Sequence, residues 1–384
     1  MRIVQAYAAK VNILLITHAV RGFIFCCVLL TSVASAQPPA SVLAHLRHGV
    51  AITGWLRFPG SRDPAVLSRW MTDAAMADLR RAGFDFVRLA VDPDVVAAPG
   101  MREVAVTAIC RLQSRGLAVV VDAHPTAWHL ETSAADRNRL LAFWRAMGPA
   151  LRRCDPLLTV PEILNEPVFP GDPASWAALQ HAILLELRAT LPHSTILLTG
   201  QDWGSIGGLL ALTPESDPNV LYSFHFYDPA ELTSLAAYRP GLDRTALARL
   251  PFPIGDRATC EGSATRPSAT GPSATGPTGE LMRYYCAMGW DRSAIEQRIG
   301  RAAAWARAHR VVLLAGEFGA SDALNPPARL AWLRTVRQAL EGSGVGWALW
   351  GYDDVMGLAV SRPPAARPML NDTVLTALGL PSRR

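Results

Sequence analysis

The chain has 384 residues, of which 50% are hydrophobic and 18% are charged. A composition this rich in apolar residues excludes disorder of the whole chain. The formal net charge is +5, but three of the 37 basic residues lie in the first 36 positions, which hold no acidic residue. The remainder carries 34 basic against 32 acidic side chains, which excludes the basic surplus of a nucleic-acid-binding protein.

The N-terminus has the pattern of a secretory signal peptide over residues 1–36. Lys10 and Arg21 supply positive charge ahead of an apolar stretch, 22–33, that is too short to span a bilayer. Ala34-Ser35-Ala36 then matches a cleavage site. An uncleaved anchor is the alternative. We therefore expect a secreted or periplasmic protein, with no membrane association after cleavage and a mature part of residues 37–384.

Beyond this segment, short apolar runs typical of buried parallel strands alternate with stretches of helical period. The predicted strands are 50–53, 84–89, 117–122, 160–164, 195–198, 220–224, 311–315 and 345–349. The predicted helices are 72–82, 103–115, 134–151, 173–191, 206–211, 293–309, 327–341 and 372–378. Eight successive β-then-α units indicate a single (β/α)8 TIM barrel of class α/β. The rival is a doubly wound open sheet, but no early strand is followed by a dinucleotide-binding glycine motif.

One connection departs from this regular alternation, because more than 60 residues separate the sixth strand from the helix at Ser293. Inside it the triplet Ser-Ala-Thr recurs three times over residues 263–277, and small, polar, proline-rich repeats predict a flexible loop without packed structure. We place this low-complexity insertion at 263–278. It is either a lid or substrate wall, or a repeat expansion that the surface tolerates.

Four cysteines remain after removal of the signal segment, and four cysteines permit three pairings. Cys260 and Cys286 bracket the insertion and are expected to pair in an oxidising compartment. Cys110, on one predicted helix, and Cys154, just after the next, would then join neighbouring helices. No spacing typical of a metal site is present, so we predict no metal and no cofactor.

Polar and aromatic side chains recur at the carboxyl-terminal tips of the predicted strands, which converge on one cleft in a barrel. Two glutamates stand out, Glu166 in Asn-Glu-Pro after the fourth strand and Glu317 in Gly-Glu-Phe-Gly after the seventh. Two carboxyl groups facing each other are what glycosidic bond cleavage requires. The other tip residues are Arg88, His124, Asn165, His225, Tyr227 and Trp350. Each motif alone is weak, since Asn-Glu-Pro is usually a turn and a single buried histidine usually belongs to a core.

Taken together and in this order, the motifs resemble glycoside hydrolase family 5, the cellulase-type family of retaining (β/α)8 glycosidases. The resemblance covers roughly residues 47–358. It implies that Glu166 is the acid/base and Glu317 the nucleophile. It also implies that the remaining six tip residues bind substrate, with Arg88 and Tyr227 beside the nucleophile and Trp350 under a sugar ring. The two carboxyl groups are expected about 5–5.5 Å apart.

The expected activity is that of an endo-β-1,4-glucanase acting as a monomer on a β-linked polysaccharide or oligosaccharide. A β-mannanase, β-1,3-glucanase or exo-β-glucosidase of the same fold is the alternative within the class. Outside it stand a catalytically inactive sugar-binding barrel and a metal-dependent hydrolase using His124 and His225. Further sugar rings are expected to stack on Trp203, and Trp55, Trp128 and Trp290 either do the same or pack loops. Asp353 and Asp354 either line a subsite or form a solvated turn.

Overall fold

The computed structural model describes residues 37–265, 276–360 and 368–382. The predicted signal peptide, residues 1–36, lies outside the described residues, as does most of the repeated segment.

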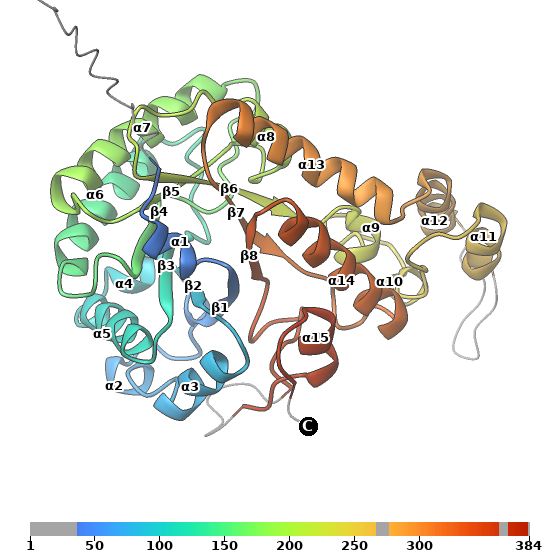
Figure 1. Cartoon of the computed structure of the whole chain (residues 1–384), viewed down its shortest axis with the longest axis horizontal. Helices are drawn as coiled ribbons and strands as arrows, with labels where there is room; N and C mark the ends of the chain where they lie inside the picture. The colour runs from blue at the N-terminus through green and yellow to red at the C-terminus, as the bar shows by residue number, and fades with distance from the viewer. Residues whose placement is uncertain (1–36, 266–275, 361–367, 383–384) are drawn as a thin grey trace, which may run out of the picture. The chain divides into compact units, whose positions relative to one another are not determined.

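Eight parallel strands close into a barrel in chain order, so the predicted single (β/α)8 barrel is confirmed (Figure 1). Each observed strand overlaps its predicted range, and most extend further toward the carboxyl end than the apolar runs suggested. The strands are β1 (His48–Leu56), β2 (Phe86–Val91), β3 (Ala118–Ala123), β4 (Thr159–Glu162), β5 (Ile196–Thr199), β6 (Val220–Phe226), β7 (Leu313–Phe318) and β8 (Gly346–Leu349).

The outer helices also agree with the predicted ranges to within a few residues. They are α3 (Asp73–Arg81), α5 (Met101–Ser114), α6 (Ala134–Leu151), α7 (Pro173–Thr190), α8 (Ile206–Leu210), α13 (Arg292–His309), α14 (Pro326–Gly342) and α15 (Asp372–Ala377). Several begin at a residue whose side chain accepts a hydrogen bond from the first turn, such as Thr72 before α3, Ser133 before α6 and Asn325 before α14. Such caps satisfy backbone N–H groups that a helix start leaves unpaired.

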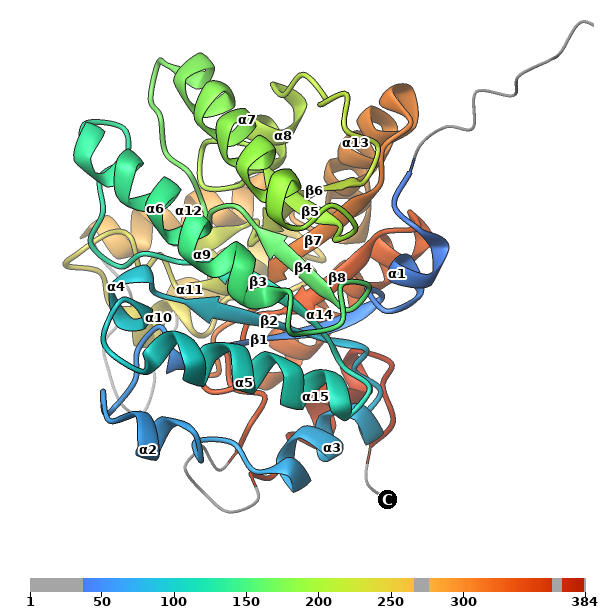
Figure 2. The same cartoon turned by 90° about the vertical axis from the view of Figure 1, so that its left-hand side faces the viewer.

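In the part of the chain that the structure describes, seven further helices were not predicted, and most are only four or five residues long. They are α1 (Ala40–Ala44), α2 (Pro64–Leu67), α4 (Pro93–Val96), α9 (Ala230–Thr233), α10 (Arg244–Leu247), α11 (Arg257–Thr265) and α12 (Gly276–Met288). A helix of four or five residues is too short for a helical period to show in the sequence, whereas α11 and α12 flank the proline-rich repeats, whose composition favoured a loop. Figure 2 shows α4 and α9–α12 at the carboxyl end of the strands and α1 at the opposite end.

The prediction of an unstructured insertion was wrong at its edges. Residues 263–265 end α11, and Gly276 and Pro277 begin α12, while 266–275 lie outside the described residues. Proline is tolerated in the first turn of a helix because its missing N–H would have no partner there. The disulfide Cys260–Cys286 joins α11 to α12 across the insertion.

The barrel interior changes from apolar to charged along three neighbouring strands. Phe86, Val120 and Val160 belong to the apolar cluster at the amino end, to which α1 contributes Val42. Two residues further along each strand, on the same face of the sheet, stand Arg88, Asp122 and Glu162. All three charged side chains are fully buried. The core therefore ends in a layer of charge directly beneath the mouth of the barrel.

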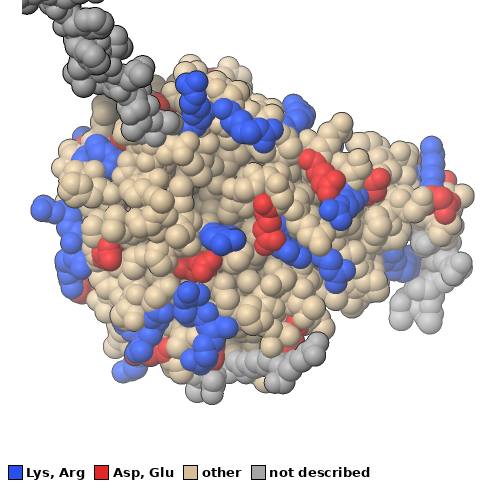
Figure 3. Space-filling model, viewed as in Figure 1, with Lys and Arg blue, Asp and Glu red and all other residues tan. Residues whose placement is uncertain are grey.

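The outer surface carries charges of both signs. On the face seen in Figure 3, basic and acidic side chains are interspersed between uncharged areas. Neighbouring helices are joined by exposed ion pairs, for example Arg145 of α6 with Glu186 of α7 at 2.9 Å. Such exposed pairs contribute little to stability, since water screens both charges.

The second disulfide, Cys110–Cys154, confirms the predicted link between helices and encloses a sequence separation of 44 residues. Replacing both cysteines by serine is expected to lower the free energy of unfolding by about 2–4 kcal/mol, because the cross-link restricts the unfolded chain. Urea unfolding of the double variant against the wild type measures this. Dithiothreitol-treated wild type should show a loss at least as large, and a loss below about 1 kcal/mol in the double variant would contradict the expectation.

Candidate active site

The carboxyl ends of the strands bring the predicted tip residues into one cluster. One side-chain oxygen of Glu166, one of Glu317 and a ring nitrogen of His225 all lie within 4.8 Å of one another. Glu166 follows β4, Glu317 lies in β7 and His225 lies in β6. The two glutamates therefore face each other across the mouth, at a separation close to that of paired carboxyl groups in retaining glycosidases.

Glu317 is held from several directions in a nearly closed environment. Its carboxylate accepts hydrogen bonds from Arg88 Nη1 at 2.5 Å and from the Tyr227 hydroxyl at 2.8 Å, and His225 Nδ1 lies 3.4 Å away. The preceding residue is glycine because a side chain at Gly316 would meet the Ser223 hydroxyl at 2.4 Å. This close approach to β6 brings Glu317 level with His225. The carboxylate is thus fixed in position and charge-compensated before any substrate arrives.

Glu166 differs from Glu317 in both exposure and backbone. Its side chain is 29% exposed, against 4% for Glu317. Its φ of +40° lies in the left-handed region, which a residue with a side chain adopts at a cost. Such strain is typical of functional sites, where the surrounding structure holds a side chain in one orientation. Glu166 contacts His225 Nδ1 at 2.9 Å, so this imidazole touches both glutamates.

Arg88 lies at the centre of the charged layer beneath the glutamates. Glu162 accepts two of its hydrogen bonds, at 2.6 and 2.9 Å, and Asp122 lies 3.1 Å from Nη2. Asn165 accepts another from Nη2 through Oδ1 at 3.0 Å. Together with Glu317, three carboxyl groups therefore surround one guanidinium.

Asp122 and Glu162 were missed in the sequence, although a signal was present. Each is a charged residue inside an otherwise apolar strand, two positions after an inward-facing valine. A carboxylate is rarely buried without a partner, so an inward charge on β3 and another on β4 indicated a shared cation. Arg88 on β2, the neighbouring strand, is that cation.

Burial disfavours the charged form of these carboxyl groups. It raises the pKa of Glu162 to about 7 and that of Asp122 to about 6, in each case against the opposing pull of Arg88. One guanidinium cannot compensate three buried negative charges, so a proton remains within the cluster near neutral pH. Glu162 has the higher of the two pKa values, so it takes up this proton before Asp122 does.

This shift predicts a pH dependence of stability that Glu162→Gln reduces. The folded state binds more protons than the unfolded state between about pH 4.5 and pH 7, because only the folded-state pKa is raised. The contribution of protonated Glu162 to the free energy of unfolding is complete below about pH 4.5 and is lost as the pH rises through about 7. Over that window, the free energy of unfolding should fall less in the variant than in the wild type, by up to about 3 kcal/mol. Urea unfolding at several pH values measures the two slopes.

The exposed Glu296→Gln variant is the matched control and should keep the wild-type slope. Glu296 lies on α13 and pairs with Arg292 across the exposed helix surface. Equal slopes for the wild type and Glu162→Gln would contradict the raised pKa.

The two histidines occupy opposite electrostatic settings. Burial lowers the pKa of His124, and the Arg57 and Arg88 guanidinium groups lower it further, so this ring is neutral. Its Nδ1 lies 2.6 Å from Asp122, and its ring centroid lies 5.7 Å from that of Trp350. Burial alone would lower the pKa of His225, but the negative charges of Glu317 and Glu166 outweigh it and raise that pKa.

The predicted sugar-stacking tryptophans separate by exposure. Trp203, after β5, has a side chain that is 58% exposed, and its backbone N–H donates to the Pro167 carbonyl, directly after Glu166. Trp55 and Trp290 are buried: Trp55 stacks on Trp70, and the Arg298 guanidinium covers the Trp290 ring at 4.4 Å. For Trp55 and Trp290 the structure favours the alternative of loop packing.

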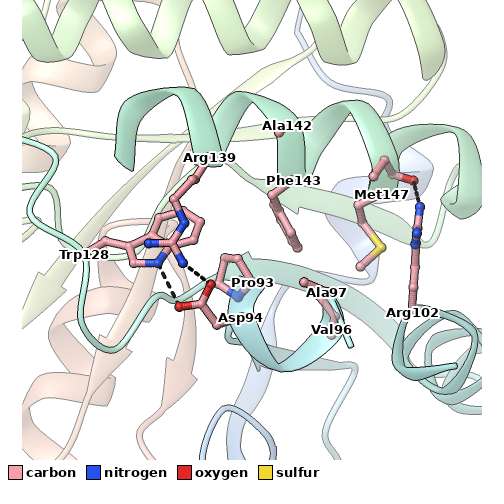
Figure 4. Close-up of a pocket in the computed structure, with 11 residues that line it drawn as sticks. Pro93, Asp94, Val96, Ala97, Arg102, Trp128, Arg139, Ala142, Phe143 and Met147 are labelled. Atoms are coloured by element: carbon pink, nitrogen blue, oxygen red, sulfur yellow. Dashed lines mark hydrogen bonds and ion pairs between the residues drawn. The ribbon is translucent and has the colours of Figure 1, made fainter. Parts of the chain in front are cut away.

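Trp128 lines a separate pocket of about 300 Å³ on the flank of the barrel, between α4 and α6 (Figure 4). Its indole N–H donates to Asp94 at 3.0 Å, and the Arg139 guanidinium lies 4.4 Å from its ring centroid. Because Asp94 also pairs with Arg139, the three side chains form a closed set of contacts. The Trp128 side chain is therefore held by Asp94 and Arg139 within this pocket.

Asp353 connects the segment after β8 to the first strand, β1. Its carboxylate accepts hydrogen bonds from the backbone N–H groups of Thr53 at 3.0 Å and Gly54 at 2.6 Å. These contacts join the segment after β8 to β1. Asp354 accepts from the N–H of Met356 at 2.8 Å, within the same segment. The two aspartates thus hold the backbone that follows Trp350.

Within residues 37–265, 276–360 and 368–382, none of the helices combines the length and the apolar character that a bilayer span requires.

A closed (β/α)8 barrel with two facing glutamates at the carboxyl end of its strands is the arrangement of a large class of glycoside hydrolases. The sequence model of one family, Cellulase (glycosyl hydrolase family 5), matches residues 53–354. The chain therefore belongs to glycosyl hydrolase family 5, a family of enzymes that hydrolyse glycosidic bonds. The resemblance inferred from the motifs is confirmed.

Curated relatives are similar at low identity. Endoglucanase 3 of Fibrobacter succinogenes is 27% identical over 195 residues, which cover 50% of this chain and 29% of that protein. Mannan endo-1,4-beta-mannosidase of Cellvibrio japonicus is 28% identical over 165 residues, 41% of this chain and 38% of that protein. The chain thus matches less than half the length of either relative. Endoglucanase C of Acetivibrio thermocellus is 21% identical over 348 residues, 86% of this chain and 98% of that protein.

Solved structures share the fold. Endoglucanase Cel5A of Thermotoga maritima aligns with a TM-score of 0.68 at 22% identity, over 89% of this chain and 99% of that chain. Complexes of that protein with mannotriose and with cellobiose align with TM-scores of 0.67 and 0.66, each at 21% identity over 88% of this chain and 98% of that chain. The cellulose synthase subunit Z of Clostridioides difficile aligns with a TM-score of 0.65 at 20% identity, over 87% of this chain and 99% of that chain. At these identities the likeness establishes the (β/α)8 fold.

Proposed function

We propose that this protein is a retaining endo-β-1,4-glucanase in which Glu317 is the nucleophile and Glu166 the general acid/base. The observation that carries the proposal is the spacing of the two carboxyl groups, whose oxygens lie within 4.8 Å. An inverting enzyme needs a wider gap, because a water molecule must fit between its second carboxylate and the sugar.

The environments of the two glutamates support this division of roles. Glu317 is buried and accepts hydrogen bonds from Arg88 and Tyr227, which hold its carboxylate in position to attack the anomeric carbon. Glu166 is more exposed and is therefore placed to give its proton to the leaving oxygen and later to take one from an incoming water. In the first step the Glu317 oxygen bonds to the anomeric carbon as the glycosidic bond breaks. In the second, water releases the sugar and restores both side chains.

His225 links the two steps. Because its Nδ1 contacts Glu166 at 2.9 Å and lies 3.4 Å from Glu317, a positive charge on the ring stabilises whichever glutamate is ionised. Its raised pKa supports such a charge near neutral pH. His225 thereby positions Glu166 and balances the charge that moves between the two carboxyl groups.

Substrate contacts follow from groups whose polar atoms remain available. Asn165 uses Oδ1 toward Arg88, which leaves its amide N–H groups to donate to a sugar hydroxyl, such as the 2-hydroxyl, whose hydrogen bond strengthens in the transition state. Trp350 offers its face beside the neutral His124 ring. Trp203, next to the acid/base, is placed under the leaving-group side of the chain.

The choice of a β-1,4-glucan rests on the relatives. Several are named endoglucanases, one is a mannan endo-1,4-beta-mannosidase, and Cel5A of Thermotoga maritima was solved with both cellobiose and mannotriose. A β-mannanase is therefore the second candidate. We further propose export, which agrees with two disulfides, and action as a monomer.

A panel of polysaccharides tests the substrate. Barley β-glucan and carboxymethyl-cellulose should be cut internally to a ladder of oligosaccharides, with glucomannan cut more slowly and laminarin left intact. Fastest cleavage of galactomannan would favour the mannanase, and release of glucose alone would favour an exo-glucosidase. No cleavage of any polymer, combined with retained binding, would favour a sugar-binding barrel.

A chelator separates this proposal from a metal-dependent hydrolase. Glu166, His225 and Glu317 present three ligand atoms close enough to hold an ion. With both glutamates serving the covalent mechanism, activity should survive ethylenediaminetetraacetate. Loss of activity that zinc or calcium restores would contradict the proposed roles.

A further inference from the structure

Arg57 is a second guanidinium in the active-site mouth, and it takes no part in the proposed mechanism. It directly follows β1, where its backbone N–H donates to the Thr53 carbonyl at 3.2 Å. Its guanidinium carbon lies 4.4 Å from the ring centroid of Phe58 and 5.9 Å from that of Trp350. Arg57 therefore stands beside the aromatic face on which a sugar ring is expected to rest.

Arg57 lacks an anionic partner in the part of the chain that the structure describes. Over residues 37–265, 276–360 and 368–382, no carboxylate lies within ion-pair distance of it, and its Nε is buried without a hydrogen-bond partner. Arg88, only one strand away, is surrounded by three carboxyl groups. A guanidinium that is desolvated on one side and unpaired costs free energy unless a ligand supplies the missing partner.

Arg57 interacts electrostatically with the charged groups of the active site. Burial lowers the pKa of Arg57, and nearby carboxylates, Asp122 foremost and then Glu317, partly offset this. The same guanidinium contributes to the lowered pKa of His124. Arg57 is thus within electrostatic reach of the catalytic glutamates without touching them, and its donors are free for a ligand.

The topology places Arg57 on the side away from the leaving group. Glu166, on β4, protonates the leaving oxygen, so the leaving part of the chain lies toward β4 and β5. In a closed ring of eight strands, β1 and β8 stand opposite. The part of the glycan that is retained in the covalent intermediate therefore extends over Trp350 toward Arg57 and Phe58, whose ring is 53% exposed.

We propose that Arg57 determines specificity by binding a carboxylate carried by the glycan on this retained side, so that the natural substrate is an acidic β-glycan. The inference rests on the proposed function. A carboxylate fits because the planar fork of arginine matches its two oxygens, and because it neutralises an otherwise unpaired charge. Sugar hydroxyl groups alone supply neither the charge nor the paired geometry. The carboxylate approaches from the Phe58 side, since Glu317 and Glu166 repel an anion from the centre of the site.

The test compares an anionic with a neutral polymer of matched length and substitution, carboxymethyl-cellulose and hydroxyethyl-cellulose. We expect Arg57→Gln to lower the ratio of the two kcat/KM values by about tenfold or more, since a charge-assisted hydrogen bond is lost for one polymer only. Arg57→Lys should lie in between, because lysine keeps the charge but lacks the fork. Arg62→Gln, an exposed arginine on the same loop, should leave both values unchanged. If the ratio of the two kcat/KM values in Arg57→Gln stays within about twofold of the wild-type ratio, the inference is overturned.

A binding measurement separates this inference from the proposed function. Isothermal titration of Glu317→Gln with cellotetraose and with a β-linked tetrasaccharide containing glucuronic acid needs no hydrolysis. The acidic ligand should bind more tightly, and adding Arg57→Gln should abolish that preference. If Glu317→Gln, which retains Arg57, binds the acidic and the neutral tetrasaccharide with equal affinity, the proposed role of Arg57 is overturned. Absence of hydrolysis by the wild type would overturn only the proposed function, provided that the acidic ligand is still preferred.

Discussion

Glu317→Ala is expected to lower kcat on β-glucan by about 10³-fold or more, because the variant lacks the carboxylate that we propose as the nucleophile. Azide should restore turnover and yield an α-glycosyl azide, since the small anion attacks from the face that Glu317 has vacated. Glu166→Ala should keep a measurable first step on an aryl glycoside, whose leaving group needs little protonation, and azide should then give a β-glycosyl azide.

The exposed Glu296→Gln variant serves as the control for both, and should match the wild type in rate and in its lack of response to azide. Circular dichroism and unfolding curves show whether each variant is folded. A folded Glu317→Ala enzyme with substantial residual kcat, or azide products of reversed configuration, would contradict the assigned roles.

Arg88→Met is expected to lower the free energy of unfolding by about 3–5 kcal/mol and to abolish activity. The reason is the charged layer beneath the active site, in which Arg88 is fully buried among Glu162, Asp122 and Glu317. Arg88 is the one cation among the described residues that contacts all three, so its removal leaves buried carboxyl groups that must either take up protons or remain uncompensated. Urea unfolding at neutral pH measures the loss.

Arg145→Met is the matched control, because Arg145 makes an exposed ion pair with Glu186. Its cost should stay below about 1 kcal/mol. Adding Glu162→Gln to Arg88→Met should recover part of the stability, since one unpaired charge is removed. Equal costs for the two arginine substitutions, or no recovery in the double variant, would contradict this account of the layer.

The architecture was accessible from the sequence because parallel strands covered on both faces give nearly continuous apolar runs. Glycine after helices such as α3 and α5 marked where the chain turns back, at Gly83 and Gly116, and both adopt a positive φ. Because Glu166 and Glu317 follow predicted strands of one parallel barrel, their sequence positions predict that they lie on the same face of it. The order of motifs along the chain, more than any single motif, carried the assignment.

The features that the sequence did not predict depend on contacts between segments that are distant along the chain. The sequence shows Asp122 and Glu162 as charged residues within predicted strands, but only the register of β2, β3 and β4 shows that they share Arg88. Trp55 and Trp290 look like loop aromatics until Trp70 and Arg298 are seen to cover them. Arg57 has no motif at all, and its position beside Trp350 follows from barrel closure between β1 and β8.

The stereochemistry of hydrolysis tests the central claim most directly. Proton NMR of the wild type acting on an aryl β-cellobioside records which anomer of cellobiose forms before mutarotation mixes the two. Two facing carboxyl groups within 4.8 Å predict that the β-anomer appears first. Initial formation of the α-anomer would mean single displacement by water and would contradict the covalent role of Glu317.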